Sequence, residues 1–448
     1  STLSRQRKLR SYQIETYWYQ NYNNRVTSRC LTPTCLDVME IDEDRVLILE
    51  DLSTIGFGSV ITSPSLDNVK TVLSWLAHFH ALFLHDQGDG LWERGTYWYL
   101  ATRPEELEKI KGERLYHFSS LIDARLNSAH FQTLLHGDAK LANFCFKPDL
   151  SGVAGVDFQY VGRGVGIKDV AYLLGSCLSS TECEHHHEEL LTWYFYELNA
   201  ALVPTVNSTL LEAEWRALYP VACADFQRFM SGWNPHHRKL THYSDQQTER
   251  GLHTIIEELM KQATDAAIAA GTYIQSRRHQ SYRIFSKGKE SQASDVLTEI
   301  DLHAQEIILT HLASSVERYY LGILAEEGEA DQSRLRCHAF WAIDPLDGTR
   351  YFVEGGSGYA VSIALVSRSG ESLLGVIYDP VNEQLFQSVK GQGVRLNGAP
   401  SPHKREGDSS PTKITWYADR SLSAHPHFKI LENRFNIIFS GGAVMNTI

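Results

Sequence analysis

The sequence predicts an α+β protein of two domains, and three observations support this prediction. The chain has 448 residues, more than one ordinary hydrophobic core holds. Acidic residues follow short apolar stretches in two separate regions, one near Asp138 and one near Asp344. A polar segment, residues 234–251, lies between these regions. We therefore expect one domain over residues 1–245 and another over residues 252–448.

Composition indicates a soluble globular chain that acts on small molecules. The formal net charge of −12 disfavours binding to nucleic acid polymers, and no basic stripe is interleaved with aromatic residues. The 7 cysteines are odd in number and lack C-x-x-C spacing, so we expect neither a disulfide framework nor a zinc module. No apolar run reaches membrane-spanning length or forms a signal peptide. A cytoplasmic location without membrane contact is the prediction.

The first region begins with mixed patterns and ends with helical ones. Aromatic residues at helical spacing predict a helix over residues 12–22, and an apolar run predicts a buried strand over residues 45–52. Helical spacing recurs over residues 69–83, where we interpret the histidines as packing or surface residues. The end of the region shows the helical pattern over residues 193–202, 210–219 and 222–233.

A pattern suited to phosphoryl transfer lies between two predicted strands of this region. His136, Asp138 and Asn143 form H-x-D-x-x-x-x-N, and a D-F-Q triplet begins at Asp157, at the end of the next strand. Transfer of a phosphoryl group to a hydroxyl needs a carboxylate beside the attacking oxygen and metal ligands that bridge the nucleotide phosphates. Asp138 is therefore the candidate base, Asn143 and Asp157 are the candidate metal ligands, and His136 is expected to brace the loop.

These residues resemble the kinase-like phosphotransferases of the aminoglycoside phosphotransferase family, most of all the ecdysteroid-kinase-like branch. The resemblance covers roughly residues 1–243 and implies a protein-kinase-like fold with a mainly helical large lobe. It also implies ATP as cofactor and a small-molecule hydroxyl acceptor. Glu15 would pair with a nucleotide-binding lysine, Glu50 to Leu52 would form the hinge that meets adenine, and Asp169 would cap the helix that supports the catalytic loop.

The second region centres on a D-x-x-D-G-T motif that begins at Asp344. The apolar run before it predicts a short buried strand over residues 339–343, and Pro345 is expected to turn both acids to one side. Divalent cations such as Mg²⁺ take oxygen ligands, while a helix that opens at the Gly-Thr offers free N–H groups to a phosphate. Taken alone, the motif could equally be a strand and an Asx turn with solvated acids. Amphipathic patterns predict helices over residues 252–273 and 302–312.

With its neighbours, this motif resembles the inositol monophosphatase family, which includes the 3'(2'),5'-bisphosphate nucleotidases. The resemblance starts near Leu252, runs to the last residue, and is carried in addition by residues 294–301, 324–327, 358–365 and 374–380. It implies a layered α/β sugar-phosphatase fold and a Mg²⁺-dependent phosphatase that acts on a small-molecule phosphomonoester. The resemblance leaves open whether the chain forms a homodimer.

By matching position, the resemblance also assigns roles to single residues. Metal ions would be held by Glu326, Asp344, Asp347 and the Leu346 carbonyl. Asp301 and Thr349 would orient the attacking water, and the N–H groups of Gly348 and Thr349 would bind phosphate. A polar loop, residues 287–292, would lie over the metals. The implied reaction is metal-assisted hydrolysis without a covalent nucleophile.

The two resemblances together predict a bifunctional fusion of a kinase-like phosphotransferase and a phosphatase. Neither a Gly-rich loop nor a strand lysine precedes Glu15, and no W-D-x-A motif, which supplies the remaining metal acid of the phosphatase family, follows Asp347. We therefore expect the chain to be cut at both ends. The alternative is that one or both domains are non-catalytic regulatory modules that bind nucleotide or phosphate.

Overall fold

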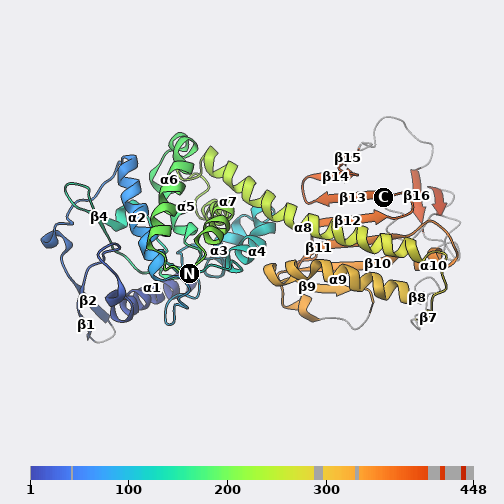
Figure 1. The fold of residues 1–448 in the computed structure, drawn as a ribbon, viewed down its shortest axis with the longest axis horizontal. Coiled ribbons are helices and arrows are strands. Elements are labelled where there is room, and N and C mark those ends of the chain that lie inside the picture. Colours follow the sequence, from blue (N-terminus) through green and yellow to red (C-terminus); the bar gives the residue numbers. More distant parts are fainter. Residues whose placement is uncertain are drawn as a thin grey trace. The chain divides into compact units, whose positions relative to one another are not determined.

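The structure is a computed structural model that describes residues 2–41, 44–286, 296–327, 332–401, 414–418 and 435–439. It divides into two compact units, residues 1–255 and 256–448, and we treat each by itself. The division falls within helix α8, His242–Arg277 (Figure 1). The domain limits 1–245 and 252–448 stay a prediction.

The polar segment that we expected between the domains is partly helical. Residues 242–251 form the first turns of α8, and two of their side chains, Tyr243 and Asp245, bond to helix α7. Gln227 Nε2 donates to Asp245 Oδ1 at 2.6 Å, and the hydroxyls of Tyr219 and Tyr243 lie 2.9 Å apart. The prediction of a helix start at Leu252 was wrong because hydrophobic periodicity does not detect polar residues that find buried partners.

The first unit is mainly helical. Its helices are α1 (Thr2–Asn21), α2 (Leu66–Leu82), α3 (Pro104–Lys109), α4 (Arg114–Asn127), α5 (Ile167–Cys177), α6 (Ser180–Ala201), α7 (Ser208–Trp233) and the start of α8, with 3₁₀ turns at Asn23–Arg25, Leu52–Ile55, Leu100–Thr102 and Leu141–Asn143. Capping boxes at Ser65 and Ser179 start α2 and α6. The stretches expected on either side of Pro220 form one helix, α7, because buried residues on both sides give it one continuous apolar face.

Strands of the first unit form antiparallel pairs. They are β1 (Cys35–Ile41) with β2 (Asp44–Leu49), β3 (Thr133–Leu135) with β6 (Gly162–Gly164), and β4 (Phe144–Phe146) with β5 (Val153–Gly155). The strand expected over residues 45–52 ends at Leu49 and is not buried, since Val46 is 36% and Ile48 38% exposed. After Leu49 the Asp51 side chain accepts the Ser53 N–H and opens a 3₁₀ turn, which ends the strand.

An aromatic cluster joins α1 and α2 to the D-F-Q triplet. The ring of Trp18, from α1, stacks on that of Phe158 with centroids 4.6 Å apart and also lies against Phe79 of α2. Phe79 in turn stacks on Trp75 at 5.0 Å. Buried aromatic side chains contribute large apolar areas to a core. The cluster therefore fixes α1, and with it Glu15, next to Asp157.

The second unit is built on a seven-stranded sheet in the order β15-β14-β13-β12-β11-β10-β9. The strands are β9 (Gly322–Ala325), β10 (Ala339–Asp347), β11 (Ala360–Ser367), β12 (Ser372–Asp379), β13 (Gln384–Val389), β14 (Gly393–Leu396) and β15 (Ala399–Pro400). Only β9 and β10 are parallel within this sheet. Smaller elements are the pairs β7 (Ile284–Ser286) with β8 (Val296–Thr298) and β16 (Ile414–Ala418) with β17 (Phe435–Phe439), the 3₁₀ turn Gln332–Leu335 and helix α10 (Thr349–Val353).

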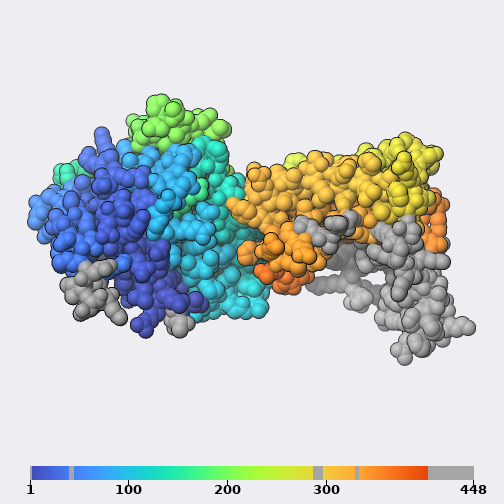
Figure 2. Space-filling model, turned by 90° about the horizontal axis from the view of Figure 1, so that it is seen from below, coloured from blue at the N-terminus to red at the C-terminus, as the bar shows by residue number. Residues whose placement is uncertain are grey.

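Two long helices pack on this sheet, the C-terminal part of α8 and α9 (Glu299–Tyr319) (Figure 1). Trp341 Nε1 of β10 donates to Ser315 Oγ of α9 at 3.1 Å, and Gln387 Nε2 of β13 donates to Thr264 Oγ1 of α8 at 2.9 Å. In Figure 2, α9 (yellow-orange) covers much of the visible face of this unit. Among the described residues, no helix is both long and apolar enough to cross a membrane.

The strand before the D-x-x-D-G-T motif is longer than predicted. Pro345 does not take the chain out of the ladder: β10 pairs with β11 at Asp344 and again at Asp347, with a register shift between them. The proline is accommodated in this irregularity, where a missing N–H costs no ladder bond. Similarly, the helix expected over residues 302–312 starts at Glu299, because Thr298 and Asp301 form a capping box.

Candidate functional site

In the first unit, the predicted base Asp138 is buried and held at both carboxylate oxygens. Its Oδ2 accepts hydrogen bonds from Asn143 Nδ2 at 3.1 Å and from Lys140 Nζ at 2.6 Å. Its Oδ1 accepts one from the Tyr172 hydroxyl at 3.0 Å. The spacing of H-x-D-x-x-x-x-N therefore brings Asp138 and Asn143 into contact.

The backbone of this loop is held by Asp169, in a way that we did not predict. Asp169 does not cap α5, whose cap position is Gly166. Its carboxylate instead accepts the N–H groups of His136 at 2.7 Å and Gly137 at 3.0 Å. Gly137 has φ +83°, a backbone conformation that residues with a side chain rarely adopt. The ring of His136, expected to brace the loop, is buried with Nε2 3.0 Å from the Val156 carbonyl oxygen.

Asp157 has the features of a cation ligand. Its backbone adopts φ +71°, an uncommon conformation for a residue other than glycine. Burial raises the pKa of its carboxyl, and the charge of Asp138 raises it further. Its Oδ1 is buried without a hydrogen-bond partner in the described part of the chain. A buried carboxylate oxygen in this state is costly unless a cation binds to it.

Glu15 lies beside the D-F-Q triplet. Its Oε1 accepts the Phe158 N–H at 3.2 Å. Burial and the charge of Asp157 raise the pKa of Glu15 to about 7. The predicted hinge residues lie elsewhere, after β2: Glu50 accepts the Thr34 N–H at 3.1 Å, and Leu52 is buried at the start of a 3₁₀ turn. The structure thus places Glu15, predicted to pair with a nucleotide-binding lysine, in contact with the D-F-Q triplet.

The raised pKa of Glu15 predicts a pH dependence of stability. Because the folded pKa lies above the unfolded value, ionisation of Glu15 opposes folding, and stability should fall as pH rises from about 4.5 to about 7. Glu15→Gln removes the charge and should flatten this slope in calorimetric unfolding of the nucleotide-free chain. Gln13→Asn, on the exposed face of the same helix, changes no titratable group; it is the matched control and should leave the slope unchanged. Parallel slopes for wild type and Glu15→Gln would contradict the prediction.

In the second unit, the acids of the predicted metal site meet at one end of β9 and β10. Ile343 pairs with Ala325 in parallel register, so Asp344 and Glu326 follow side by side, and the Glu326 N–H donates to the Ile343 carbonyl at 3.0 Å. Burial raises the pKa of Asp344 to about 9, and the nearby charges of Glu326 and Asp347 contribute. Three carboxyl groups that disfavour one another's ionisation therefore share this end of the sheet.

These acids are neighbours, yet they do not form a closed ligand shell. Among the described residues, no group of three or more His, Cys, Asp or Glu side chains is placed to hold one ion. Glu326 is exposed, and Asp344 Oδ1 accepts the Leu346 N–H at 3.1 Å. The polar loop at 287–292, expected over the metals, lies outside the described residues. The three acids therefore form a cluster because their charges affect one another, and not because their oxygens surround one point.

Asp301 and Thr349 do meet, as the predicted water-orienting pair. Thr349 Oγ1 lies 2.9 Å from Asp301 Oδ1 and 2.9 Å from the Leu346 carbonyl oxygen. Asp301 is 1% exposed, and its Oδ2 accepts both the N–H and the hydroxyl of Thr298. Burial raises the pKa of Asp301. Gly348, with φ +86°, forms the cap of α10 before Thr349.

Sequence reasoning gave no role to several residues that reach the predicted sites, among them Tyr172 and Lys239. Tyr172 bonds to Asp138, and Lys239 bonds to Tyr172. One signal was available for Tyr172: it follows Asp169 by three residues, which places both on one face of a helix. Lys239 follows the first-region motif at a large distance in sequence, and no local pattern marks it.

Comparison with known proteins assigns a family to each unit. The inositol monophosphatase family matches residues 255–441, and the ecdysteroid kinase-like family matches residues 14–85 and 92–204. The chain joins an ecdysteroid kinase-like domain to an inositol monophosphatase domain. Both matches confirm the resemblances that the motifs indicated, and the order of the two domains along the chain is the predicted one.

Individual relatives include inositol monophosphatases and SuhB proteins. The chain is 34% identical over 148 residues to inositol monophosphatase 1 of Solanum lycopersicum, which covers 32% of this chain and 51% of the relative. It is 36% identical over 137 residues to Nus factor SuhB of Vibrio cholerae, covering 31% of this chain and 49% of the relative. The chain spans about half the length of the curated relatives it matches. Among solved structures, SuhB of Bartonella henselae is 27% identical with a TM-score of 0.36, covering 42% of this chain and 72% of that chain.

Proposed function

We propose that the chain is bifunctional, with a Mg²⁺-dependent phosphomonoesterase in the inositol monophosphatase domain and an ATP-dependent small-molecule phosphotransferase in the kinase-like domain. The observation that carries the phosphatase proposal is the Thr349 hydroxyl, held between Asp301 and the Leu346 carbonyl beside the acid cluster. A hydroxyl that is held by a buried carboxylate can accept a hydrogen bond from water and thereby orient that water. The cytoplasm is our proposed location, since the 7 cysteines show no disulfide spacing.

A bound cation would relieve the repulsion within the acid cluster. Without one, the charges of Glu326 and Asp347 oppose ionisation of Asp344, whose pKa is about 9. Those three carboxylates and the Leu346 carbonyl would hold Mg²⁺. When bound, Mg²⁺ would supply an electrophile and increase the acidity of a nearby water. The N–H groups of Gly348 and Thr349 are the proposed contacts for the phosphate of the substrate.

In this mechanism, Asp301 and Thr349 position the attacking water. The capping box fixes Asp301, since Thr298 occupies its Oδ2 and leaves Oδ1 for the Thr349 hydroxyl. The Thr349 oxygen keeps a lone pair with which it would accept a water proton. The attack is then on phosphorus, and no side chain of the domain forms a covalent intermediate.

Replacing Thr349 tests this role directly. Thr349→Val keeps the shape of the side chain and should lower kcat for phosphate release by about 10²-fold, because the water loses its acceptor. The Mg²⁺ affinity should stay near the wild-type value. Thr349→Ser, which keeps the hydroxyl, is the matched control and should retain most of the activity. If Thr349→Val turned over at the wild-type rate, Thr349 would not orient the water.

For the kinase-like domain, the supporting observation is the unpartnered Oδ1 of Asp157 beside Asp138 and Asn143. Asp157 and Asn143 would hold the Mg²⁺ that accompanies ATP, and Asp138 would accept the proton of the acceptor hydroxyl. Glu15 would pair with a nucleotide-binding lysine, and Glu50 to Leu52 would meet adenine. The acceptor is a small molecule with a free hydroxyl.

Two assays test the proposal as a whole. Phosphate release is measured with inositol 1-phosphate, histidinol phosphate and 3'-phosphoadenosine 5'-phosphate in the presence of Mg²⁺, and ADP release is measured with Mg·ATP. Turnover in both assays supports the bifunctional enzyme. Binding of Mg²⁺ or ATP without turnover would instead favour the alternative of non-catalytic regulatory modules. Sedimentation of the same samples tests for a homodimer.

A further inference from the structure

A chain of hydrogen bonds leads from Lys239 to Asp138 in the kinase-like domain. Lys239 Nζ donates to the Tyr172 hydroxyl at 3.2 Å, and this hydroxyl donates to Asp138 Oδ1 at 3.0 Å. The other carboxylate oxygen, Oδ2, is bonded to Asn143 and Lys140. Tyr172 therefore bonds to the Asp138 oxygen that the proposed metal ligand Asn143 does not contact.

Aromatic rings hold Tyr172, the middle residue of these hydrogen bonds, in place. Tyr172 is 2% exposed, and its ring packs against those of Tyr97, Trp98 and Phe226 at centroid distances of 5.6, 5.0 and 5.0 Å. Lys239 Nζ lies 4.4 Å from the centroid of the Tyr172 ring. A cation over an aromatic face is attracted by the ring as well as by the hydroxyl. The amine is thus fixed by two contacts with the same residue.

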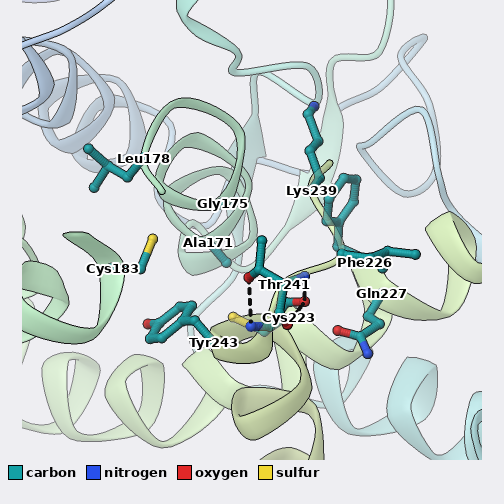
Figure 3. Close-up of a pocket in the computed structure, with 12 residues that line it drawn as sticks. Ala171, Gly175, Leu178, Cys183, Cys223, Phe226, Gln227, Lys239, Thr241 and Tyr243 are labelled. Atoms are coloured by element: carbon teal, nitrogen blue, oxygen red, sulfur yellow. Dashed lines mark hydrogen bonds between the residues drawn. The ribbon is translucent and has the colours of Figure 1, made fainter. Parts of the chain in front are cut away.

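Lys239 reaches this position from the wall of a cavity. The cavity is also lined by residues of α5, α6 and α7, among them Ala171, Cys183 and Cys223. In Figure 3, Lys239 extends past Phe226, and its amine points away from the other lining side chains. The stem of the lysine therefore packs in the cavity, while its charged end is directed to the catalytic loop.

The charges support a donor role for both groups. Burial raises the pKa of the Tyr172 hydroxyl, which stays protonated and can donate to Asp138. Burial lowers the pKa of Lys239 to about 8, an effect that the charge of Asp138 opposes and those of Lys140 and Arg238 reinforce. Below this pKa the amine is charged and has N–H groups to donate.

We propose that Lys239 and Tyr172 are positioning residues for phosphoryl transfer. Lys239 orients the Tyr172 hydroxyl, and this hydroxyl fixes the rotation of the Asp138 carboxylate, so that one oxygen faces the acceptor. The proposal rests on the proposed phosphotransferase function. A purely packing role for Lys239 is the competing explanation, and the following variants separate the two.

The first test measures ADP release from Mg·ATP with water as the acceptor. Lys239→Met keeps a stem of similar volume and should lower kcat about tenfold with the KM for ATP unchanged, because a hydrogen bond to a charged network is lost. Lys239→Arg should restore most of the rate. Tyr172→Phe should also lower kcat, and the double variant should lose no more than Tyr172→Phe alone. A wild-type rate in Lys239→Met, or fully additive losses in the double variant, would overturn the proposal.

The second test needs no turnover. The nucleotide-free chain is acetylated with acetic anhydride at neutral pH, and the labelling rate of Lys239 is read by peptide mass spectrometry. Asp138→Asn removes a charge that keeps Lys239 protonated, so the rate should rise severalfold, while that of the exposed Lys261 should not change. An unchanged Lys239 rate would show that the two residues are not coupled and would overturn the proposal. A coupled Lys239 in a chain that releases no ADP would instead refute the phosphotransferase function and leave the hydrogen-bond chain intact.

Discussion

Asp344→Asn should abolish phosphate release by the inositol monophosphatase domain and weaken its binding of Mg²⁺. The substitution removes one carboxylate from a cluster in which Glu326 and Asp347 also carry charge, so the remaining oxygens neutralise a divalent ion less well. We expect phosphate release to drop by at least about 10³-fold, with kinase activity preserved. Calorimetric Mg²⁺ titration and a phosphate-release assay on the same sample measure both effects.

The same substitution should have the opposite effect on the metal-free fold. Burial and neighbouring charges raise the pKa of Asp344 to about 9, so at neutral pH its carboxylate, ionised in the unfolded chain, must take up a proton on folding. This proton uptake costs stability, and the neutral asparagine avoids the cost. Metal-free Asp344→Asn should therefore unfold at a higher temperature than the wild type. Asp265→Asn, in a surface ion pair with Lys261, is the control and should change neither property. Unchanged Mg²⁺ stoichiometry and affinity in Asp344→Asn would remove this residue from the metal site.

Asp138→Asn should depress phosphoryl transfer by the kinase-like domain by about 10²-fold to 10⁴-fold while ATP binding stays close to normal. The lost carboxylate acts on the acceptor hydroxyl and not on the nucleotide. The asparagine keeps one oxygen for the Tyr172 hydroxyl, so the loop should hold its shape. ADP release and ATP titration calorimetry provide the two readouts.

Asp157→Asn is the matched comparison, because Asp157 lies in the same site with a different proposed task. Its unpartnered buried oxygen makes it the proposed ligand of the nucleotide-bound metal, so this variant should bind Mg·ATP more weakly. A wild-type transfer rate in Asp138→Asn would show that Asp138 is not the base. Equal effects of both variants on ATP binding would show that their tasks are not separate.

The sequence predicted best the contacts between residues of one short loop and the contacts between residues of two recognisable motifs. Asn143 follows Asp138 by five positions, and a tight turn brings them within hydrogen-bond distance. The parallel register of β9 and β10 explains why Glu326 and Asp344, from two motifs, meet. Glu326 directly follows β9, Asp344 ends the apolar run of β10, and Asp138 comes shortly after β3. Hydrophobicity marks the ends of such apolar runs well.

The contacts that sequence reasoning missed depend on tertiary packing. Asp169 fitted the pattern of a helix cap, yet its carboxylate bonds to the backbone of a loop more than thirty residues earlier. Lys239 stands in a polar stretch that looked like a linker, and only the packing of Tyr172 and Phe226 explains its position. Local propensity cannot identify partners of this kind, because the interaction exists only when distant segments have folded together.

The capping box at the start of α9 ties the proposed chemistry of the inositol monophosphatase domain to the end of a helix. One carboxylate, that of Asp301, satisfies the backbone of Thr298 through one oxygen and the hydroxyl of Thr349 through the other. Fraying of the first turn of α9 would release Asp301 and disorganise the site while the sheet stays folded. Heat inactivation of this domain should thus precede its unfolding. A change at the start of α9 would therefore also change the proposed water-positioning pair, Asp301 and Thr349.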